Sequence, residues 1–257
     1  MYFTVLKKKK ILKATSLFLV LIILMFSAYS LGAFKMVEGV SSRKLPIYYV
    51  KTDEKKIAIS FDCAWGTDYT EKLLSIMQDE KVRCTFFMVE FWTKKYPEMV
   101  KKISDFGHEI GTHSATHPYM SKLNQNDIIK ELSSSSTAIT EITGKKVEVF
   151  RPPYGDYDDL LIETAENLGL FTIQWDVDSL DWKNLSANEI TSRVVKKVKN
   201  GSIVLFHNQG IHTAEALPQI IKELKKRGYV FVPIGELIYR DNYFMAVDGA
   251  QVQLKSS

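Results

Sequence analysis

From about residue 54 to residue 240, short apolar runs alternate with longer segments in which apolar residues recur every three or four positions. The short runs predict strands, and they cover residues 56–61, 84–89, 108–114, 147–150, 171–179, 202–207 and 229–234. The longer segments predict helices, and they cover residues 67–81, 96–107, 124–144, 158–169, 186–201 and 214–228. This order indicates parallel strands joined by helical crossovers, and about seven such units suit an α/β barrel.

Capping residues predict the ends of two helices. Asp68 is expected to cap the first helix, because Glu71 follows it at the spacing of a capping box. The longest helix is expected to start near Asn124 and to end at Gly144.

The N-terminal 34 residues have a different pattern. Residues 14–34 contain no charged side chain, and five lysines at positions 7–10 and 13 precede them. About 20 apolar residues span a bilayer as a helix, and lysines before the span favour a cytoplasmic N-terminus. We expect a single-pass anchor, with a cleavable signal peptide as the alternative, since small residues follow the apolar centre. Either way the domain is expected outside the cytoplasmic membrane, anchored or secreted.

The charge of the chain belongs to this N-terminal segment. The formal net charge is +4, but outside residues 1–34 there are 29 basic residues against 30 acidic ones. We therefore predict no nucleic-acid surface. Nothing in the pattern indicates a second folded domain, and we expect a monomer.

Polar residues cluster where the predicted strands end. They are Asp62, His113, His117, Arg151, Tyr154, Asp178, Asp181, Trp182 and His207. The C-terminal ends of parallel barrel strands lie on one face, where active sites form, so these residues are expected to converge. The alternative is a chance arrangement, because loops are polar in general.

Five of these strand ends resemble the motifs of one enzyme family. The segments "SFDCAWG", "HSATHP", "RPPYG", "DSLDW" and "LFH" occur in the order of the motifs of polysaccharide deacetylases, the NodB-type domains of carbohydrate esterase family 4. With the N-terminal segment, they are most similar to the membrane-anchored branch of spore-forming Gram-positive bacteria. The resemblance implies a distorted (β/α) barrel that removes acetyl groups from N-acetylglucosamine or N-acetylmuramic acid units, mostly with a zinc-like divalent metal.

The resemblance also implies a division of the chain. We expect a basic cytoplasmic end at 1–13, the anchor or signal peptide at 14–34 and a linker at 35–53. The polysaccharide deacetylase domain is expected at 54–240, and a polar tail without a clear core role at 241–257.

Each motif residue takes a role from the family. Asp62 matches the catalytic base, Arg151 its ion-pair partner, His207 the general acid and Asp181 the carboxylate that orients that histidine. The spacing of His113 and His117 would place both imidazoles on one face of a helical turn, and the family binds its metal there. The backbone N–H of Tyr154 would stabilise the oxyanion, while Trp182 and Leu205 would wall the acetyl pocket.

Cys63 departs from the family pattern, which has a metal-binding Asp at this position. If the strand continues past Asp62, alternation turns Cys63 into the core; if it ends there, the thiolate can join the two histidines on zinc. A reactive thiol is a third reading. Cys84 begins the next strand, so the two sulfurs should lie near opposite strand ends and no disulfide is expected.

Two classes of function follow from these residues. The first is a metal-dependent N-deacetylase of cell-wall or spore-wall peptidoglycan, or of chitin-like oligosaccharides. The second is a catalytically weak, glycan-binding relative without a complete metal site. Retention of both the base and the acid favours the enzyme.

Overall fold

The computed structural model describes residues 18–27 and 43–254. Residues 18–27 form a helix, and no helix in these two ranges is long and apolar enough to cross a membrane. The predicted basic end, most of the predicted anchor and residues 35–42 of the predicted linker lie outside the described residues. The folded unit begins at Lys44.

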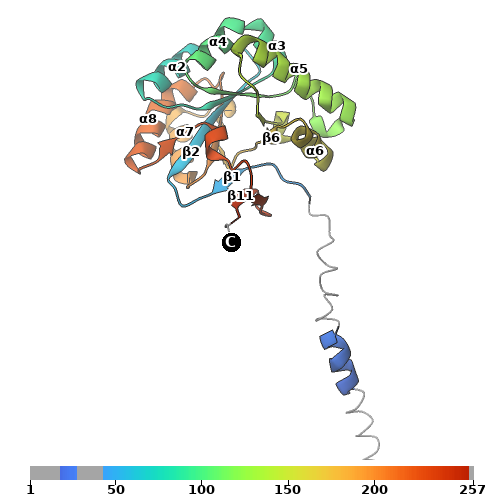
Figure 1. Cartoon of the computed structure of the whole chain (residues 1–257). Helices are drawn as coiled ribbons and strands as arrows, with labels where there is room; N and C mark the ends of the chain where they lie inside the picture. The colour runs from blue at the N-terminus through green and yellow to red at the C-terminus, as the bar shows by residue number, and fades with distance from the viewer. Residues whose placement is uncertain (1–17, 28–42, 255–257) are drawn as a thin grey trace, which may run out of the picture. The chain divides into compact units, whose positions relative to one another are not determined.

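A curled sheet of parallel strands forms the centre of the folded unit (Figure 1). Its order is β6-β5-β4-β3-β2-β8-β7, and β9 pairs with the start of β2. The strands are β2 (Lys56–Cys63), β3 (Thr85–Met88), β4 (Glu109–Thr112), β5 (Val149–Phe150), β6 (Phe171–Thr172), β7 (Val177–Asp178), β8 (Ile203–His207) and β9 (Val230–Phe231). No described strand pair joins β6 to β7, so the predicted barrel is an open, distorted one.

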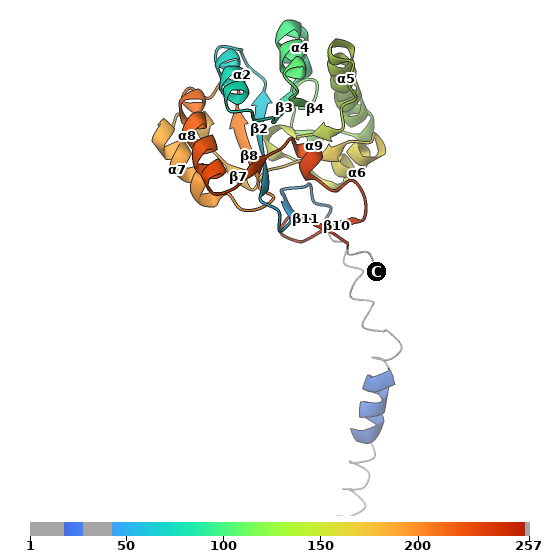
Figure 2. The same cartoon turned by 60° about the vertical axis from the view of Figure 1, so that its left-hand side comes forward.

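Helices follow one another around the outer side of this sheet (Figure 2). They are α2 (Thr70–Asp79), α3 (Glu90–Lys95), α4 (Pro97–Asp105), α5 (Gln125–Thr143), α6 (Asp159–Asn167), α7 (Ala187–Lys197) and α8 (Thr213–Lys226). The short helix α9 (Ile234–Leu237) instead packs Ile234 and Leu237 on the other face of the sheet. Short 3₁₀ turns are η2 (Met120–Lys122), η3 (Pro153–Gly155) and η4 (Asp181–Lys183). The helix α5 is capped by Asn124 and ends at Gly144 in the left-handed region, as predicted.

Two apolar clusters lie on the two faces of the sheet. The larger one packs the helices against alternate strand residues such as Phe61, Phe86 and Phe206, whose rings stack at 5.1 and 5.6 Å between centroids. The smaller one contains Ala58 and Phe87. Because side chains alternate between the faces of a strand, the position of Phe61 in the outer cluster directs Asp62 to the inner face.

Two local predictions differ from the structure. The predicted strand 171–179 is two strands, β6 and β7, which lie at opposite ends of the sheet. The predicted cap Asp68 does not cap α2, which begins after Tyr69 without a side-chain cap; Asp68 accepts a hydrogen bond from Gln209 Nε2 instead. Both outcomes depend on contacts between segments that are distant in the sequence.

The predicted polar tail forms strands with a core role. Strands β10 (Tyr243–Met245) and β11 (Ala250–Gln253) make a small sheet with β1 (Tyr49–Lys51), which lies in the predicted linker. Ala250 and Gln251 are buried, and the Gln251 side chain bonds both backbone groups of Tyr239. The expectation that residues after 240 lack a core role is therefore wrong for these two strands.

Gly201 joins this small sheet to the larger one. Its carbonyl accepts from Val50 N–H and its N–H donates to Lys56 O, with φ at +76°. A Cβ atom on Gly201 would lie 1.7 Å from Val50 O.

We predict that Gly201→Ala destabilises the fold far more than Gly144→Ala does. Both residues have positive φ, but nothing lies within 4 Å of a Cβ at Gly144. The Gly144 variant should therefore lose only about 1–2 kcal/mol for the left-handed backbone. Gly201→Ala should lose about 2 kcal/mol more, because the backbone of β1 must move. Urea unfolding measures the free energy of unfolding of both variants. Equal losses in the two variants would contradict the importance of the close approach between Gly201 and Val50.

Candidate active site

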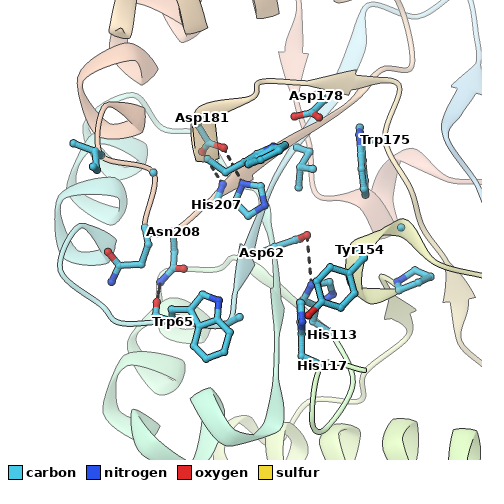
Figure 3. Close-up of a pocket in the computed structure, with 18 of the residues that line it drawn as sticks. Asp62, Trp65, His113, His117, Tyr154, Trp175, Asp178, Asp181, His207 and Asn208 are labelled. Carbon is cyan, nitrogen blue, oxygen red and sulfur yellow. Dashed lines mark hydrogen bonds and ion pairs between the residues drawn. The ribbon is translucent and has the colours of Figure 1, made fainter. Parts of the chain in front are cut away.

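A cavity of about 670 Å³ opens at the C-terminal ends of the strands (Figure 3). Its wall includes the ends of β2 and β8 and the segments that follow β4, β5 and β7. The lining side chains are Asp62, Ala64, Trp65, His113, His117, Pro152, Tyr154, Gly155, Trp175, Asp178, Asp181, Trp182, Asn184, Leu205, His207, Asn208, Gln209, Gly210 and Ile211. The predicted residues therefore converge, except that Arg151 and Cys63 do not line the cavity.

Arg151 lies directly behind Asp62. Its Nη1 donates to Asp62 Oδ1 at 2.8 Å and its Nη2 donates to the Gln174 carbonyl at 3.2 Å. The guanidinium is fully buried and lies over the Phe87 ring, 4.2 Å from its centroid. Burial opposes ionisation of Asp62, but the charges of Arg151 and of nearby histidines outweigh it and lower the pKa of this carboxyl. Asp62 is thus an ionised group held in one orientation at the floor of the cavity.

His207 and Asp181 form a second pair beside Asp62 in the same cavity (Figure 3). Asp181 Oδ1 contacts His207 Nδ1 at 2.8 Å, and Asp181 Oδ2 accepts from His207 N–H and from Thr213 Oγ1. Burial would lower the pKa of His207, but the hydrogen bond and charge of Asp181 outweigh it and raise the pKa. The pair therefore presents a histidine whose Nε2 is the free ring nitrogen and whose protonated form is stabilised.

His113 and His117 lie next to Asp62. They follow β4 in a loop, not in the helical turn that their spacing predicts, and both Ser114 and His117 have positive φ. The two rings nevertheless meet edge to face with centroids 4.9 Å apart. His113 Nδ1 contacts the Arg151 carbonyl at 2.7 Å, which leaves Nε2 directed at Asp62 Oδ2, 3.6 Å away. Burial lowers the pKa of His113 to about 4 and also lowers the pKa of His117, so both rings can be neutral and offer a lone pair.

Cys63 does not join these histidines. Strand β2 continues through Cys63, which pairs with Met88 of β3, so its side chain lies on the opposite face from Asp62. It is fully buried in the outer cluster, and burial raises the pKa of its thiol well above the usual value. Cys84 is also buried and free, as expected from the strand ends. The position of the Cys63 side chain therefore agrees with the first of the three readings, in which it fills the core.

The three-ligand metal site implied by the family pattern is therefore incomplete. Within residues 18–27 and 43–254, no three His, Cys, Asp or Glu side chains are placed to hold a metal ion together. Two histidines remain, and the buried Nδ1 of His117 has no hydrogen-bond partner. A zinc site in a protein needs more ligands than the two that His113 and His117 supply. The donor set of the described residues therefore does not fit the expected ion.

Three further predicted residues line the cavity. Tyr154 has φ at +60° between Pro153 and Gly155, a strained conformation of the kind found at functional sites. Leu205 is buried on β8 and Trp182 is exposed on η4, so both are available to a small apolar group. Other histidines lie elsewhere: His108 contacts Cys84 in the core, and His212 pairs with Glu215 on α8.

The sequence analysis missed Trp65, Trp175 and the loop that begins at Asn208. Buried Asn208 donates from Nδ2 to the Gly66 carbonyl at 3.0 Å and to Thr70 Oγ1 at 3.2 Å. Trp92 Nε1 donates to the same Gly66 carbonyl at 2.7 Å. The available signal was position, because Trp65 and Asn208 each follow a strand end that carries a motif residue.

Comparison with known proteins agrees with this arrangement. The family profile described as polysaccharide deacetylase matches residues 49–173. A peptidoglycan-N-acetylglucosamine deacetylase of Bacillus cereus is 36% identical over 194 residues, which are 74% of this chain and 91% of that protein. The peptidoglycan-N-acetylmuramic acid deacetylase PdaA of Bacillus subtilis is 34% identical over 196 residues, 75% of this chain and 74% of PdaA.

Two further proteins resemble this chain, one in sequence and one in both sequence and fold. The uncharacterized protein YlxY of Bacillus subtilis is 36% identical over 193 residues, 75% of this chain, and the match spans 60% of YlxY. A solved structure of a Bacillus anthracis CE4 family pseudoenzyme has a TM-score of 0.73 at 32% identity, covering 85% of this chain and 75% of that one. A mutant of this pseudoenzyme, described as having restored enzymatic activity, has the same TM-score at 34% identity. These likenesses in sequence and fold show that the chain belongs to the polysaccharide deacetylase family.

Proposed function

We propose that this protein removes N-acetyl groups from the glycan of a bacterial cell wall. One observation carries the proposal: an ionised carboxylate, Asp62, and a histidine with a raised pKa, His207, line the same cavity, each held by a buried partner. Amide hydrolysis needs a base for the attacking water and an acid for the departing amine, and these two groups supply both. The named peptidoglycan deacetylases among the relatives support N-acetylglucosamine or N-acetylmuramic acid as the reacting unit.

Asp62 acts as the base. Its carboxylate takes a proton from the water that attacks the acetyl carbonyl, while Arg151 keeps the carboxylate ionised and fixes its orientation. The backbone N–H of Tyr154 stabilises the negative charge that develops on the carbonyl oxygen. Trp182 and Leu205 contact the acetyl methyl group and exclude water around it.

His207 acts as the acid. Asp181 holds Nδ1, so the proton that moves to the departing nitrogen comes from Nε2. Collapse of the tetrahedral intermediate then breaks the C–N bond, which leaves acetate and a free amine on the sugar. The zinc expected from the family pattern stays a prediction, and the roles above are those of this chain's own residues.

A second candidate function is glycan binding with little hydrolysis. The specific observation in its favour is Cys63, which lies in the core where the family pattern has a metal ligand. Likeness to a solved CE4 pseudoenzyme also supports it. The two functions make different demands: both need the cavity, but only the first needs Asp62 and His207.

The place of action follows from the substrate. Peptidoglycan lies outside the cytoplasmic membrane, so we propose that the domain acts there, attached through residues 14–34 or secreted after their cleavage. We propose that it acts as a monomer.

We predict that His207→Gln lowers acetate release by about 100-fold or more, since positioned acid catalysis contributes about 10²–10⁴. The substrates are N-acetylglucosamine oligomers and peptidoglycan, and acetate is measured enzymatically. The Michaelis constant should change little, because His207 acts on the departing amine. No acetate from the unaltered chain, with glycan binding intact, would replace the deacetylase by the second candidate.

We predict that Asp181→Asn moves the alkaline limit of activity to lower pH. His207 must be protonated to act, so activity falls as pH rises through its pKa. The carboxylates of Asp181, Asp62 and Asp178 raise that pKa, and Asp181 contributes most of the increase. Asp105→Asn, which removes a surface carboxylate on α4, is the matched control and should leave the profile unchanged. An unshifted profile for Asp181→Asn would contradict the role of the pair.

We predict that Cys63→Ala leaves the metal content unchanged and lowers the free energy of unfolding by about 1–2 kcal/mol, because a buried group is removed from the core. Cys84→Ala is the matched control, since it is an equally buried free thiol. Elemental analysis after exposure to zinc measures the first effect and urea unfolding the second. Loss of zinc in the Cys63 variant alone would identify the thiolate as a ligand.

A further inference from the structure

A buried glutamine lies behind the wall of the cavity. Gln174 follows β6, is only 2% exposed and does not line the cavity itself. Its backbone carbonyl accepts from Arg151, the ion-pair partner of Asp62. Its side chain donates to Gly155, the residue after Tyr154 in η3. Gln174 therefore connects the support of the carboxylate to the turn that carries Tyr154.

The backbone of Gln174 is fixed by two neighbours. Its N–H donates to the Ile47 carbonyl at 2.8 Å, and its carbonyl accepts from Arg151 Nη2 at 3.2 Å. Ile47 also donates from its own N–H to the Thr172 carbonyl at 2.9 Å and forms a parallel bridge with Ile173. The side chain of Gln174 therefore starts from a backbone that its neighbours hold in place.

The side-chain amide of Gln174 contacts the turn η3. Its Nε2 donates to the Gly155 carbonyl at 3.0 Å. A Cβ atom on Gly155 would lie 3.3 Å from Gln174 Oε1 and 3.2 Å from Trp175 Cη2, so the turn also packs closely on both side chains. The hydrogen bond and the packing act together on the residue that follows Tyr154.

The turn needs such support because its backbone is strained. Tyr154 has φ at +60° and Gly155 has φ at +67°, so two successive residues lie in the left-handed region. Glycine adopts this region freely, but a tyrosine residue persists there only when surrounding contacts offset the cost. The Gly155 N–H donates to the Pro152 carbonyl at 3.1 Å and closes the turn.

The other end of the turn has an anchor of its own. Asp156 accepts from the N–H and from the Oγ of Ser121 in η2, both at 2.8 Å. The turn is thus held by Gln174 on one side and by Asp156 on the other. Loss of the Gln174 contact would loosen the turn without releasing it from the fold.

We propose that Gln174 is a positioning residue that keeps the backbone N–H of Tyr154 directed at the acetyl carbonyl oxygen. The inference rests on the proposed function, in which this N–H stabilises the oxyanion. Such a donor is effective only when it is held in advance where the negative charge develops. A change of the Gln174 side chain separates this role from the support of Arg151, which depends on the backbone carbonyl of residue 174.

The test compares Gln174→Met with Gln251→Met in the full chain. Methionine is similar in length to glutamine and lacks the amide. Gln251 is the matched control, because it is a fully buried glutamine outside the cavity whose Nε2 donates to the Tyr239 carbonyl at 2.7 Å.

The first measurement is hydrogen exchange of the Gly155 N–H by nuclear magnetic resonance, which needs no catalysis. Gln174→Met should speed this exchange about tenfold, as the loss of one hydrogen bond implies. Gln251→Met should leave the rate unchanged. Gln174→Asn keeps an amide on a shorter side chain and should act as Gln174→Met does, so it replaces that variant if methionine prevents folding.

The second measurement is the kinetics of acetate release. We expect Gln174→Met to lower kcat about 10- to 100-fold, as a small misplacement of an oxyanion donor implies. KM should change less than about threefold, because the charge on the oxygen develops only in the transition state. The acid limit of activity reports the ionisation of Asp62 and should not move, because Arg151 keeps its backbone contact.

Several results would overturn the inference. Unchanged exchange at Gly155 in Gln174→Met would mean that the amide does not hold the turn. An equal loss of kcat in Gln251→Met would identify a general effect of a lost buried amide. A raised KM with an unchanged kcat would mean that the turn serves only the binding of the substrate.

The outcome for Gln174 is separate from the outcome for hydrolysis. If the unaltered chain releases no acetate, the proposed hydrolysis fails, and exchange at Gly155 alone decides whether Gln174 holds the turn. If acetate is released and Gln174→Met keeps the kcat of the unaltered chain, the hydrolysis stands and the positioning role fails.

Discussion

The candidate site depends on one buried ion pair, between Arg151 and Asp62. A fully buried guanidinium costs several kcal/mol in desolvation, and only a close, well-oriented carboxylate offsets that cost. The same arginine residue also contacts the Gln174 carbonyl after β6 through its side chain, and its own carbonyl contacts His113 after β4. Through its side chain and its carbonyl, this one residue thus connects the ends of β2, β4 and β6. Removing either partner would leave an uncompensated buried charge, which typically costs about 3–5 kcal/mol.

The two sides of the cavity differ in how they hold charge. On the Asp62 side, a carboxylate and a guanidinium neutralise each other, and His113 is neutral because its pKa lies near 4. On the other side, Asp181 is fully buried while His207 is partly exposed and has a raised pKa. When the surroundings of two groups shift their pKa values in opposite directions, one cavity can contain both an acid and a base. The opposite pKa shifts of Asp62 and His207 arise from their different partners, because the two residues themselves lie at equivalent ends of neighbouring parallel strands.

The sequence predicts the parts of this site that follow from local pattern. The strand and helix order, the limits of α5 and the gathering of polar strand ends all come from periodicity and capping, and the structure agrees with them. It could not predict that residues 171–179 would divide between two edges of the sheet, or that residues after 240 would pair with β1, because both depend on partners far along the chain. The histidine loop shows the same limit. Its spacing suggests a helical turn, yet positive φ at Ser114 and His117 brings the rings together.

Alternation along β2 links the chemistry of the site to its core. Adjacent residues of a strand face opposite sides, so Asp62 enters the cavity only because Cys63 packs with the helices. A metal ligand at position 63 would require β2 to end one residue earlier, and the pairing of residue 63 with Met88 would then be lost. Trp65 and Tyr154 make no such demand, since Trp65 lies on a loop and Tyr154 in η3, both beyond the strand ends. The side chain at position 63 and the aromatic lining of the cavity are therefore structurally independent in this fold.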